Sequence, residues 1–183
     1  MGCELCNILA GESKAVIIHE DDRAVIAVRD HVLTPGQITV FPREHAPILE
    51  MVSEDVLSHC AVLANKVSIA VFECLGAKGT NILVRNGLGA GQNIPHFGIE
   101  VIPRQDNDGL NLQWEPKQLS EDELDRTFVL LKDEFAALQG QTEKPTTAEK
   151  TVEPKEVVSE PKEEKISGKE KPNYLLKSLK KIP

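Results

Sequence analysis

The sequence has few aromatic residues, no excess of basic charge and no long apolar run. Aromatic side chains make up 4% of its 183 residues, so a hydrophobic core has to be built from aliphatic side chains. The formal net charge of −8 argues against a general nucleic-acid binder, because such proteins present a basic face. No stretch approaches the roughly 18 uninterrupted apolar residues of a membrane span. The N-terminus lacks the basic start and apolar run of a secretory signal, so we expect a cytoplasmic protein.

Charge and composition divide the chain into a folded part and a tail. Residues 1–140 carry 11 Lys and Arg against 21 Asp and Glu, whereas residues 141–183 carry 10 Lys against 8 Glu. The segment 140–172 is mainly Glu, Lys, Pro, Thr and Ser, which bury too little apolar surface to offset the entropy of ordering. It therefore predicts a disordered linker, and the domain is predicted to span residues 1–139.

The last eleven residues, 173–183, differ from the linker. They combine three lysines with apolar residues spaced three and four apart, a pattern typical of a short amphipathic helix. We interpret this segment as a docking peptide for an unknown protein partner or an anionic surface. A merely solvated tail is the alternative.

Periodicity within the domain predicts five strands and two helices. Apolar residues recurring at three and four predict a long helix over residues 53–75, with Ser53 as its N-cap and with Cys60 and Cys74 in the core. A capping box predicts a second helix over residues 120–138. This order of elements indicates an α+β fold with an antiparallel sheet. Short aliphatic runs between turn residues predict the strands 15–19, 24–28, 36–41, 80–84 and 94–102.

Two sequence features point to chemistry. The pair Cys3-x-x-Cys6 suits either a metal site or a redox dithiol, and zinc prefers four nitrogen or sulfur ligands. The glycine-rich loop 86–92 exposes backbone N–H groups that suit phosphate, although this signal has low specificity. The histidines available to complete a metal site are His19, His31, His45, His59 and His96.

Several motifs in order, between Cys3 and Arg104, resemble the histidine-triad superfamily of nucleotide hydrolases and transferases. They are the Cys-x-x-Cys segment 3–12, Asp30 ahead of Pro35-Gly36, the segment 40–45, and the glycine-rich loop before a histidine-bearing strand. The resemblance implies an α+β homodimer, joined through the long helix and a sheet edge, with a purine-nucleotide pocket in each protomer. It also implies that Asp30 holds the ribose hydroxyls. The residues that match the family's phosphate loop are Asn86, Gly91, Gln92 and Asn93.

The sequence departs from the family at the triad itself. Anchored by Gly91-Gln92 and Pro103-Arg104, the register keeps the first histidine as His96 but puts Gly98 and Glu100 at the second and third positions. In the family the second histidine attacks the α-phosphorus, and loss of a nucleophile typically costs about four to six orders of magnitude in turnover. An anionic Glu100 about 4 Å from a phosphate would weaken binding by roughly 4 kcal/mol. The sequence therefore predicts that the family's phosphoryl chemistry is lost.

The metal ligands of the family's zinc-bearing members are all matched. The resemblance assigns zinc to Cys3, Cys6, His45 and His96. Such a closed, four-ligand set is how structural zinc is held.

Three functions remain open at this stage. The first is a non-catalytic, dimeric interaction module that binds nucleotide weakly. The second is a nucleotide hydrolase or transferase with an altered mechanism in which Glu100 is the base. The third is a redox or metal-handling protein that uses Cys3 and Cys6.

Overall fold

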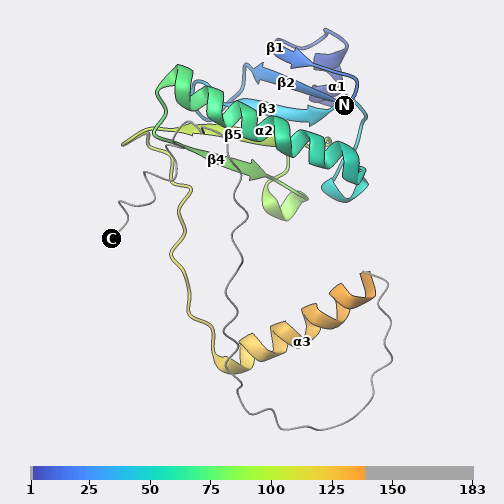
Figure 1. Cartoon of the computed structure of the whole chain (residues 1–183), viewed down its shortest axis with the longest axis vertical. Coiled ribbons are helices and arrows are strands. Elements are labelled where there is room, and N and C mark those ends of the chain that lie inside the picture. The colour runs from blue at the N-terminus through green and yellow to red at the C-terminus, as the bar shows by residue number, and fades with distance from the viewer. Residues whose placement is uncertain (1, 139–183) are drawn as a thin grey trace, which may run out of the picture. The chain divides into compact units, whose positions relative to one another are not determined.

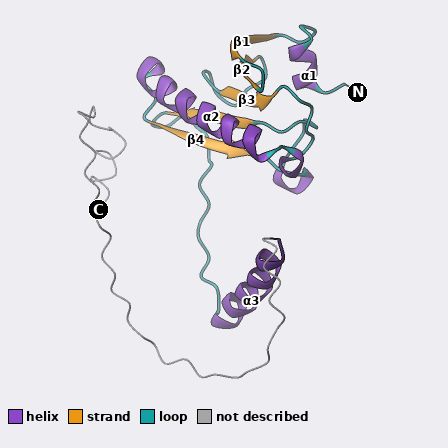
Figure 2. Ribbon diagram, turned by 45° about the vertical axis from the view of Figure 1, so that its right-hand side comes forward, coloured by secondary structure: helices purple, strands orange, loops and turns teal. Residues whose placement is uncertain are grey.

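A computed structural model describes residues 2–138, and the predicted linker and docking peptide lie outside the described residues (Figures 1 and 2). The chain divides into one compact unit, Met1–Pro116, and a second unit that begins at Lys117. In chain order the elements are α1 (Glu4–Leu9), β1 (Ala15–Glu20), β2 (Ala24–Arg29), β3 (Ile38–Pro42), α2 (Glu54–Leu75), β4 (Gly79–Val84), β5 (Ile99–Arg104) and α3 (Glu121–Leu138), with short 3-10 turns at Leu49–Met51 and Leu88–Ala90.

The five strands form a single antiparallel sheet in the order β1-β2-β3-β5-β4. The β1–β2 hairpin is closed by Asp21, whose carboxylate accepts the N–H groups of Arg23 and Ala24, both at 2.9 Å. Strand β3 pairs directly with β5, although helix α2 and strand β4 lie between them in the sequence. Segments far apart in the chain therefore meet within the sheet. The predicted α+β class with an antiparallel sheet is confirmed.

Helix α2 covers one face of the sheet and forms the larger core with it (Figure 1). The helix begins directly after Ser53, as predicted, although the Ser53 side chain makes no capping hydrogen bond. It ends at Leu75. The next residue, Gly76, adopts the left-handed conformation at φ 64° that is common just past a helix C-terminus. Its inward stripe consists of Cys60, Leu63, Ala64, Val67 and Val71.

Helix α2 is, by length and composition alone, the one helix among residues 2–138 that is apolar enough to cross a membrane. Its five buried residues belong to the core with the sheet, and other apolar residues of the helix, such as Val62 and Ile69, are exposed.

The short helix α1, which the sequence analysis did not predict, covers the opposite face of the sheet. Successive strand residues point to opposite faces, so Val25 and Ala27 face away from α2. With Phe41 they form a second core against Leu5 and Ile8 of α1. This small core places the Cys-x-x-Cys segment over β2 and β3.

Two predictions about buried residues and strand limits are wrong. Cys74 is exposed, because it lies in the last turn of α2, beyond Val71, the last buried residue of the helix. Strand β5 begins at Ile99 and not at Ile94. In the segment before it, the His96 N–H bonds to the Ile94 carbonyl at 2.8 Å and the Phe97 N–H to the Ala46 carbonyl at 2.6 Å, so neither N–H takes part in the sheet.

Helix α3 belongs to the second unit and is described by itself. It begins with the predicted capping box: the Ser120 N–H donates to the Glu123 carboxylate at 3.0 Å, and the Glu123 N–H donates to the Ser120 hydroxyl at 3.4 Å. One stripe of apolar residues, spaced four and three apart, runs along this helix, and every residue of the stripe is exposed. The stripe consists of Leu124, Phe128, Leu131, Phe135 and Leu138.

Candidate metal centre and adjoining pocket

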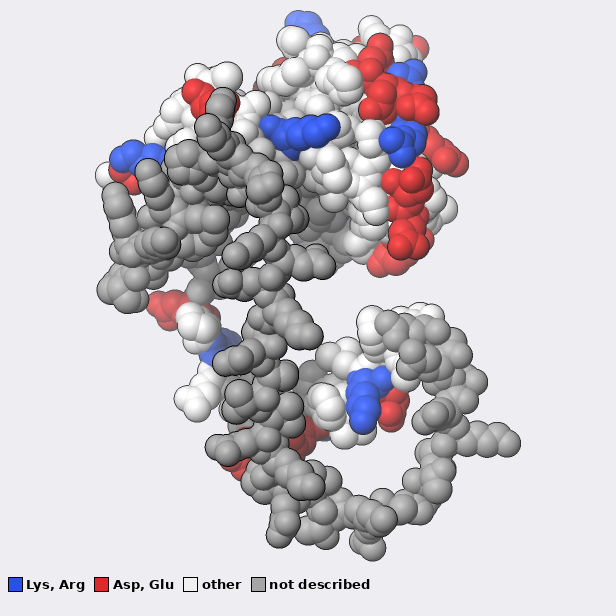
Figure 3. All heavy atoms as spheres, in the orientation of Figure 1, with Lys and Arg blue, Asp and Glu red and all other residues white. Residues whose placement is uncertain are grey.

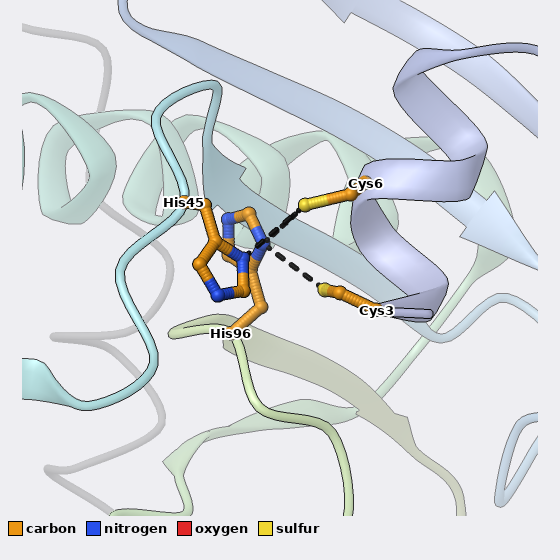
Figure 4. A group of neighbouring side chains, drawn as sticks. All are labelled: Cys3, Cys6, His45 and His96. Carbon is orange, nitrogen blue, oxygen red and sulfur yellow. Dashed lines mark hydrogen bonds between the residues drawn. The ribbon is translucent and has the colours of Figure 1, made fainter. Parts of the chain in front are cut away.

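Four potential metal ligands from three separate segments converge at one end of the sheet (Figure 4). Cys3 precedes α1, Cys6 lies in α1, His45 follows β3, and His96 precedes β5. Their ligand atoms all lie within 4.8 Å of one another. The Cys6 Sγ is 3.2 Å from His45 Nδ1 and 3.5 Å from His96 Nδ1, and the Cys3 Sγ is 3.4 Å from His96 Nδ1.

Hydrogen bonding prepares His96 to be a ligand. Its Nε2–H donates to the Pro42 carbonyl at 3.0 Å, which leaves the Nδ1 lone pair directed at the two thiols. Burial is the main cause of a lowered pKa at His96, so the ring is neutral, the form that binds metal. The ring also packs edge-on against Phe41 and His45, with centroids 5.7 and 5.1 Å away.

Thiols are favourable ligands for zinc, and the surroundings of Cys6 disfavour its thiolate form before metal binds. Burial, followed by the neighbouring Cys3, raises the pKa of Cys6. Thiolate ligands therefore form here together with metal binding, with release of protons. Two sulfur and two nitrogen donors that can approach one point suit a tetrahedral zinc ion. This donor set hints at metal binding and fits the zinc that the sequence analysis assigned.

A small pocket adjoins the metal centre at the triad positions. His96, Gly98 and Glu100 all line it, together with Gln92 and Asn93 of the predicted phosphate loop. Its volume is about 30 Å³. The enclosed part of the pocket is therefore large enough for about one or two water molecules.

Gly98 offers no functional group to the pocket, and its surroundings are packed. A Cβ at this position would lie 3.4 Å from Thr39 Cγ2 and 3.8 Å from Leu5 Cδ1 and from Phe41 Cβ. These are ordinary van der Waals distances, so the backbone does not require glycine here. This is the position at which the resemblance leads the sequence analysis to expect a histidine.

Glu100 is not the free anion that the sequence analysis expected to face phosphate. The side chain is 10% exposed, and its carboxylate accepts hydrogen bonds from Arg29 Nη2 at 3.0 Å, Gln37 Nε2 at 2.7 Å and Thr39 Oγ1 at 2.9 Å. The guanidinium of Arg29 compensates its charge. The repulsion of roughly 4 kcal/mol, which assumed an unpaired carboxylate, therefore overstates the effect of Glu100 on a bound anion.

The predicted nucleotide-binding residues do not all meet at this pocket. Asn86 supports the loop instead: its Oδ1 accepts the Leu49 N–H at 2.9 Å, and its Nδ2 donates to Glu50 at 2.8 Å. Gln92 also braces the loop, through the Gly87 N–H and the carbonyls of Pro47 and Ile94.

Gly91 and Asp30 do not line the pocket either. Gly91 ends the 3-10 turn at φ 77°, a conformation that favours glycine. Asp30 is exposed, and its carboxylate pairs with His31 at 2.9 Å, which lowers the pKa of Asp30.

Arg29 and Arg85 are the functional residues that the sequence analysis missed. Arg85 lines the pocket, although the neighbouring Asn86 was predicted to do so. Arg29 pairs with Glu100, as described above. Arg29 could have been found from the sequence, because it is a charged residue at the end of the apolar strand 24–29. A buried charge there needs a partner of opposite charge.

Comparison with known proteins identifies the family. The HIT domain model matches residues 10–107, more than half of the chain, so the chain belongs to the HIT domain family. The match begins after the Cys-x-x-Cys segment and includes the triad positions.

Curated relatives share about a third of their aligned residues with this chain. An uncharacterised HIT-like protein of Saccharolobus solfataricus is 35% identical over 106 residues, which are 58% of this chain and 76% of that protein. Adenylylsulfatase HINT3 of Arabidopsis thaliana is 33% identical over 108 residues, which are 59% of this chain and 55% of that protein.

Solved structures share the fold. A HIT family protein from Bacillus anthracis has a TM-score of 0.66 at 25% identity, with 73% of this chain and 96% of that chain covered. A Zn-bound histidine triad family protein from Mycobacterium smegmatis has a TM-score of 0.57 at 26% identity, with 76% and 97% covered.

Proposed function

We propose that this chain is a non-catalytic HIT-family protein, a zinc-bearing interaction module whose nucleotide pocket binds ligand weakly. The observation that carries the proposal is the absence of any side chain at Gly98, where the family keeps the group that attacks phosphorus. The pocket at that position has a volume of about 30 Å³.

Neither neighbouring triad residue is free to replace the missing nucleophile. His96 directs Nδ1 at the thiols and donates Nε2–H to Pro42, so both ring nitrogens are engaged. Both carboxylate oxygens of Glu100 already accept hydrogen bonds. The alternative mechanism, with Glu100 as general base, would first have to release these contacts.

Zinc, in this proposal, is held by Cys3, Cys6, His45 and His96. Support comes from the convergence of the four ligand atoms and from the zinc-bound relative of Mycobacterium smegmatis. With four protein ligands the ion has no open position for water, so its contribution is a cross-link between α1 and the segments flanking β3 and β5. The same cross-link argues against the redox alternative, because zinc binding and disulfide formation compete for the same two thiolates.

The remaining parts of the proposal concern partners. Helix α2 and edge strand β4 expose the apolar residues Val62, Ile69 and Ile82, which favours a homodimer through these two elements. Acidic side chains gather along one side of the sheet-bearing unit (Figure 3), an arrangement unfavourable for nucleic acid. Residues 173–183 would contact a protein partner, and the compartment would be the cytoplasm.

A hydrolysis assay tests the loss of catalysis. Zinc-loaded protein is incubated with adenosine 5′-phosphoramidate and with adenylyl sulfate, the second because of the named activity of the Arabidopsis relative. We expect AMP release indistinguishable from the protein-free background, given a loss of about four to six orders of magnitude. A HIT protein with an intact triad serves as the sensitivity control. Turnover by the wild-type chain that disappears in Glu100→Gln would establish the altered-mechanism enzyme instead.

Calorimetric titration tests the weak nucleotide binding. AMP, GMP and a non-hydrolysable dinucleotide are titrated into the zinc-loaded chain, and dissociation constants of about 1 mM or weaker are expected from the small pocket. Micromolar affinity for any of the three would contradict this part of the proposal.

A further inference from the structure

Arg29 joins three elements of the sheet-bearing unit through one side chain. Its guanidinium donates from Nη1 to Glu4 of α1 at 3.1 Å, from Nε to Thr39 of β3 at 3.0 Å, and from Nη2 to Glu100 of β5 at 3.0 Å. The Arg29 side chain is 9% exposed. An arginine fork fixed at three points in a buried site has little freedom left.

Glu4, the residue of α1 that Arg29 contacts, lies between the two thiol ligands in the sequence. Glu4 is in the first turn of α1, with Cys3 immediately before it and Cys6 two residues after it. A six-residue helix is not stable by itself in water. Helix α1 therefore depends on external contacts, which are the burial of Leu5 and Ile8 and the Glu4–Arg29 ion pair.

The other end of the network is anchored in the sheet next to the nitrogen ligand. Glu100 lies in β5, four residues after His96, and is also held by Gln37 and Thr39. The described part of the chain contains no buried side-chain nitrogen or oxygen without a hydrogen bond. Arg29 thus spans the distance between the segment that carries the thiols and the strand that follows the histidine.

We propose that Arg29 is a positioning residue for the metal centre: anchored by Glu100, it holds Glu4 and so keeps Cys3 and Cys6 in place opposite His96. On this proposal Glu100, at the third triad position, helps to retain the metal by anchoring Arg29. The inference rests on the proposed zinc centre and adds to it the residues that set how long the ion stays bound. Contacts outside the ligand shell typically change metal affinity by about 10–100-fold.

The experiment measures zinc release from the full-length chain to excess 4-(2-pyridylazo)resorcinol by stopped-flow absorbance. Glu4→Gln removes the ion pair between Glu4 and Arg29 and leaves the pair between Arg29 and Glu100 in place. Glu12→Gln is the matched control, since Glu12 is also a glutamate, lies just beyond α1, and is exposed with no side-chain partner within residues 2–138. We expect release about tenfold faster in Glu4→Gln and unchanged in Glu12→Gln.

A second measurement separates positioning from a purely electrostatic effect of Glu4 on the ion. Hydrogen exchange of the α1 amides is followed in both zinc-loaded variants and is expected to be at least threefold faster in Glu4→Gln alone. In the charge-neutral background Arg29→Met/Glu100→Met, adding Glu4→Gln is expected to change zinc release by less than twofold, because its partner is already absent.

The outcomes distinguish this inference from the proposed function. If the wild-type chain binds no zinc, the proposed centre and the positioning role fail together. If it binds zinc but Glu4→Gln releases the ion at the wild-type rate, the positioning role alone fails. Faster release with unchanged α1 exchange, or with the full effect retained in the Met/Met background, would assign the effect to charge and overturn the positioning role.

Discussion

At the scale of single residues, Cys60 and Cys74 show how one helix gives two thiols opposite environments. Both were predicted to be core residues from their apolar surroundings in the sequence. Cys60 is fully buried against the sheet, and burial is the main cause that raises the pKa of its thiol to about 11. Cys74 is exposed in the last turn of the same helix. The helical period does not separate them, because fourteen residues are almost four complete turns and the two side chains point within about 40° of each other. They differ because Cys74 lies beyond Val71, the last buried residue of the helix.

Thiol labelling should therefore count the free cysteines in two stages. In zinc-loaded native protein, Ellman's reagent is expected to react rapidly with Cys74 only, since Cys60 is buried and protonated and the other two thiols hold metal. Addition of EDTA is expected to raise the count of reactive thiols from about one to about three, and guanidinium to about four. Three rapid thiols before EDTA would contradict a bound metal at Cys3 and Cys6.

Asp21 is the second residue whose environment yields a prediction. Its carboxylate accepts two backbone N–H groups of the β1–β2 turn and the His59 Nε2–H at 2.7 Å. Desolvation is the largest single contribution and by itself raises the pKa of Asp21. The hydrogen bonds together outweigh it and hold this pKa well below its ordinary value. A depressed pKa stabilises the fold at neutral pH, and this stabilisation is lost as the pH falls below about 4 towards the native pKa.

Asp21→Asn is accordingly expected to lower the free energy of unfolding by roughly 1–3 kcal/mol at pH 7. The difference from wild type should shrink at pH 3, where the carboxylate of the unfolded chain is largely protonated. Urea titrations at both pH values measure the change. Asp22→Asn, at the exposed neighbouring position, is the control and should stay within about 0.5 kcal/mol of wild type. An equal loss in both variants would refute the role of the Asp21 contacts.

At the scale of elements, predictions succeed where a periodic pattern is long and fail where a contact between distant segments decides. The α2 stripe and the capping box of α3 were readable because helical spacing and Ser120 with Glu123 are local signals. Helix α1 was missed because six residues give too short a pattern. The early start assigned to β5 failed because the Phe97 N–H bonds to Ala46, a contact across 51 positions that no local pattern reveals.

Helix α1 should also be the element that responds most to metal removal. It is short, buries only Leu5 and Ile8, and carries or directly follows two of the four proposed ligands. Structural zinc contributes on the order of 10 kcal/mol to a small domain. EDTA is expected to lower the melting temperature by at least 10 °C and to accelerate amide exchange in α1 more than in α2. A melting temperature unaffected by EDTA in a protein shown to contain zinc would contradict a structural role.

At the scale of the whole molecule, the sheet-bearing unit presents apolar side chains at both of its edges. Val62 and Ile69 of α2 are 52% and 49% exposed, and Ile82 of edge strand β4 is 52% exposed. At the other edge, β1 exposes Ile18. The family resemblance favours the α2–β4 side for self-association, and burial of such residues is the usual driving force for a dimer.

Charge substitutions on the two sides test this assignment. Ile69→Glu is expected to convert the proposed homodimer to a monomer in light scattering after gel filtration, because a buried unpaired carboxylate is strongly unfavourable at an interface. Ile18→Glu on β1 is the matched control and should leave the dimer intact. Dissociation by Ile18→Glu but not by Ile69→Glu would place the interface at the opposite edge.

From the sequence, the candidate site could be predicted only as far as its four proposed metal ligands and the positions of Gly98 and Glu100. Cys3, Cys6, His45 and His96 were assigned by matching motifs, and the fold brings them together. The partner of Glu100 could not be predicted, because Arg29 is 71 positions away and only the β2-β3-β5 order brings them into contact. For the same reason the charge of Glu100 was judged as if it were unpaired.

The ion pair between Arg29 and Glu100 also constrains which substitutions could place histidines at positions 98 and 100. Glu100→His by itself would leave the Arg29 guanidinium without its buried partner and would weaken its hold on Glu4. Gly98→His by itself would place an imidazole next to a carboxylate that is already engaged by Arg29, Gln37 and Thr39. Under the proposed function, a complete triad would thus require coordinated changes at Gly98, Glu100 and Arg29.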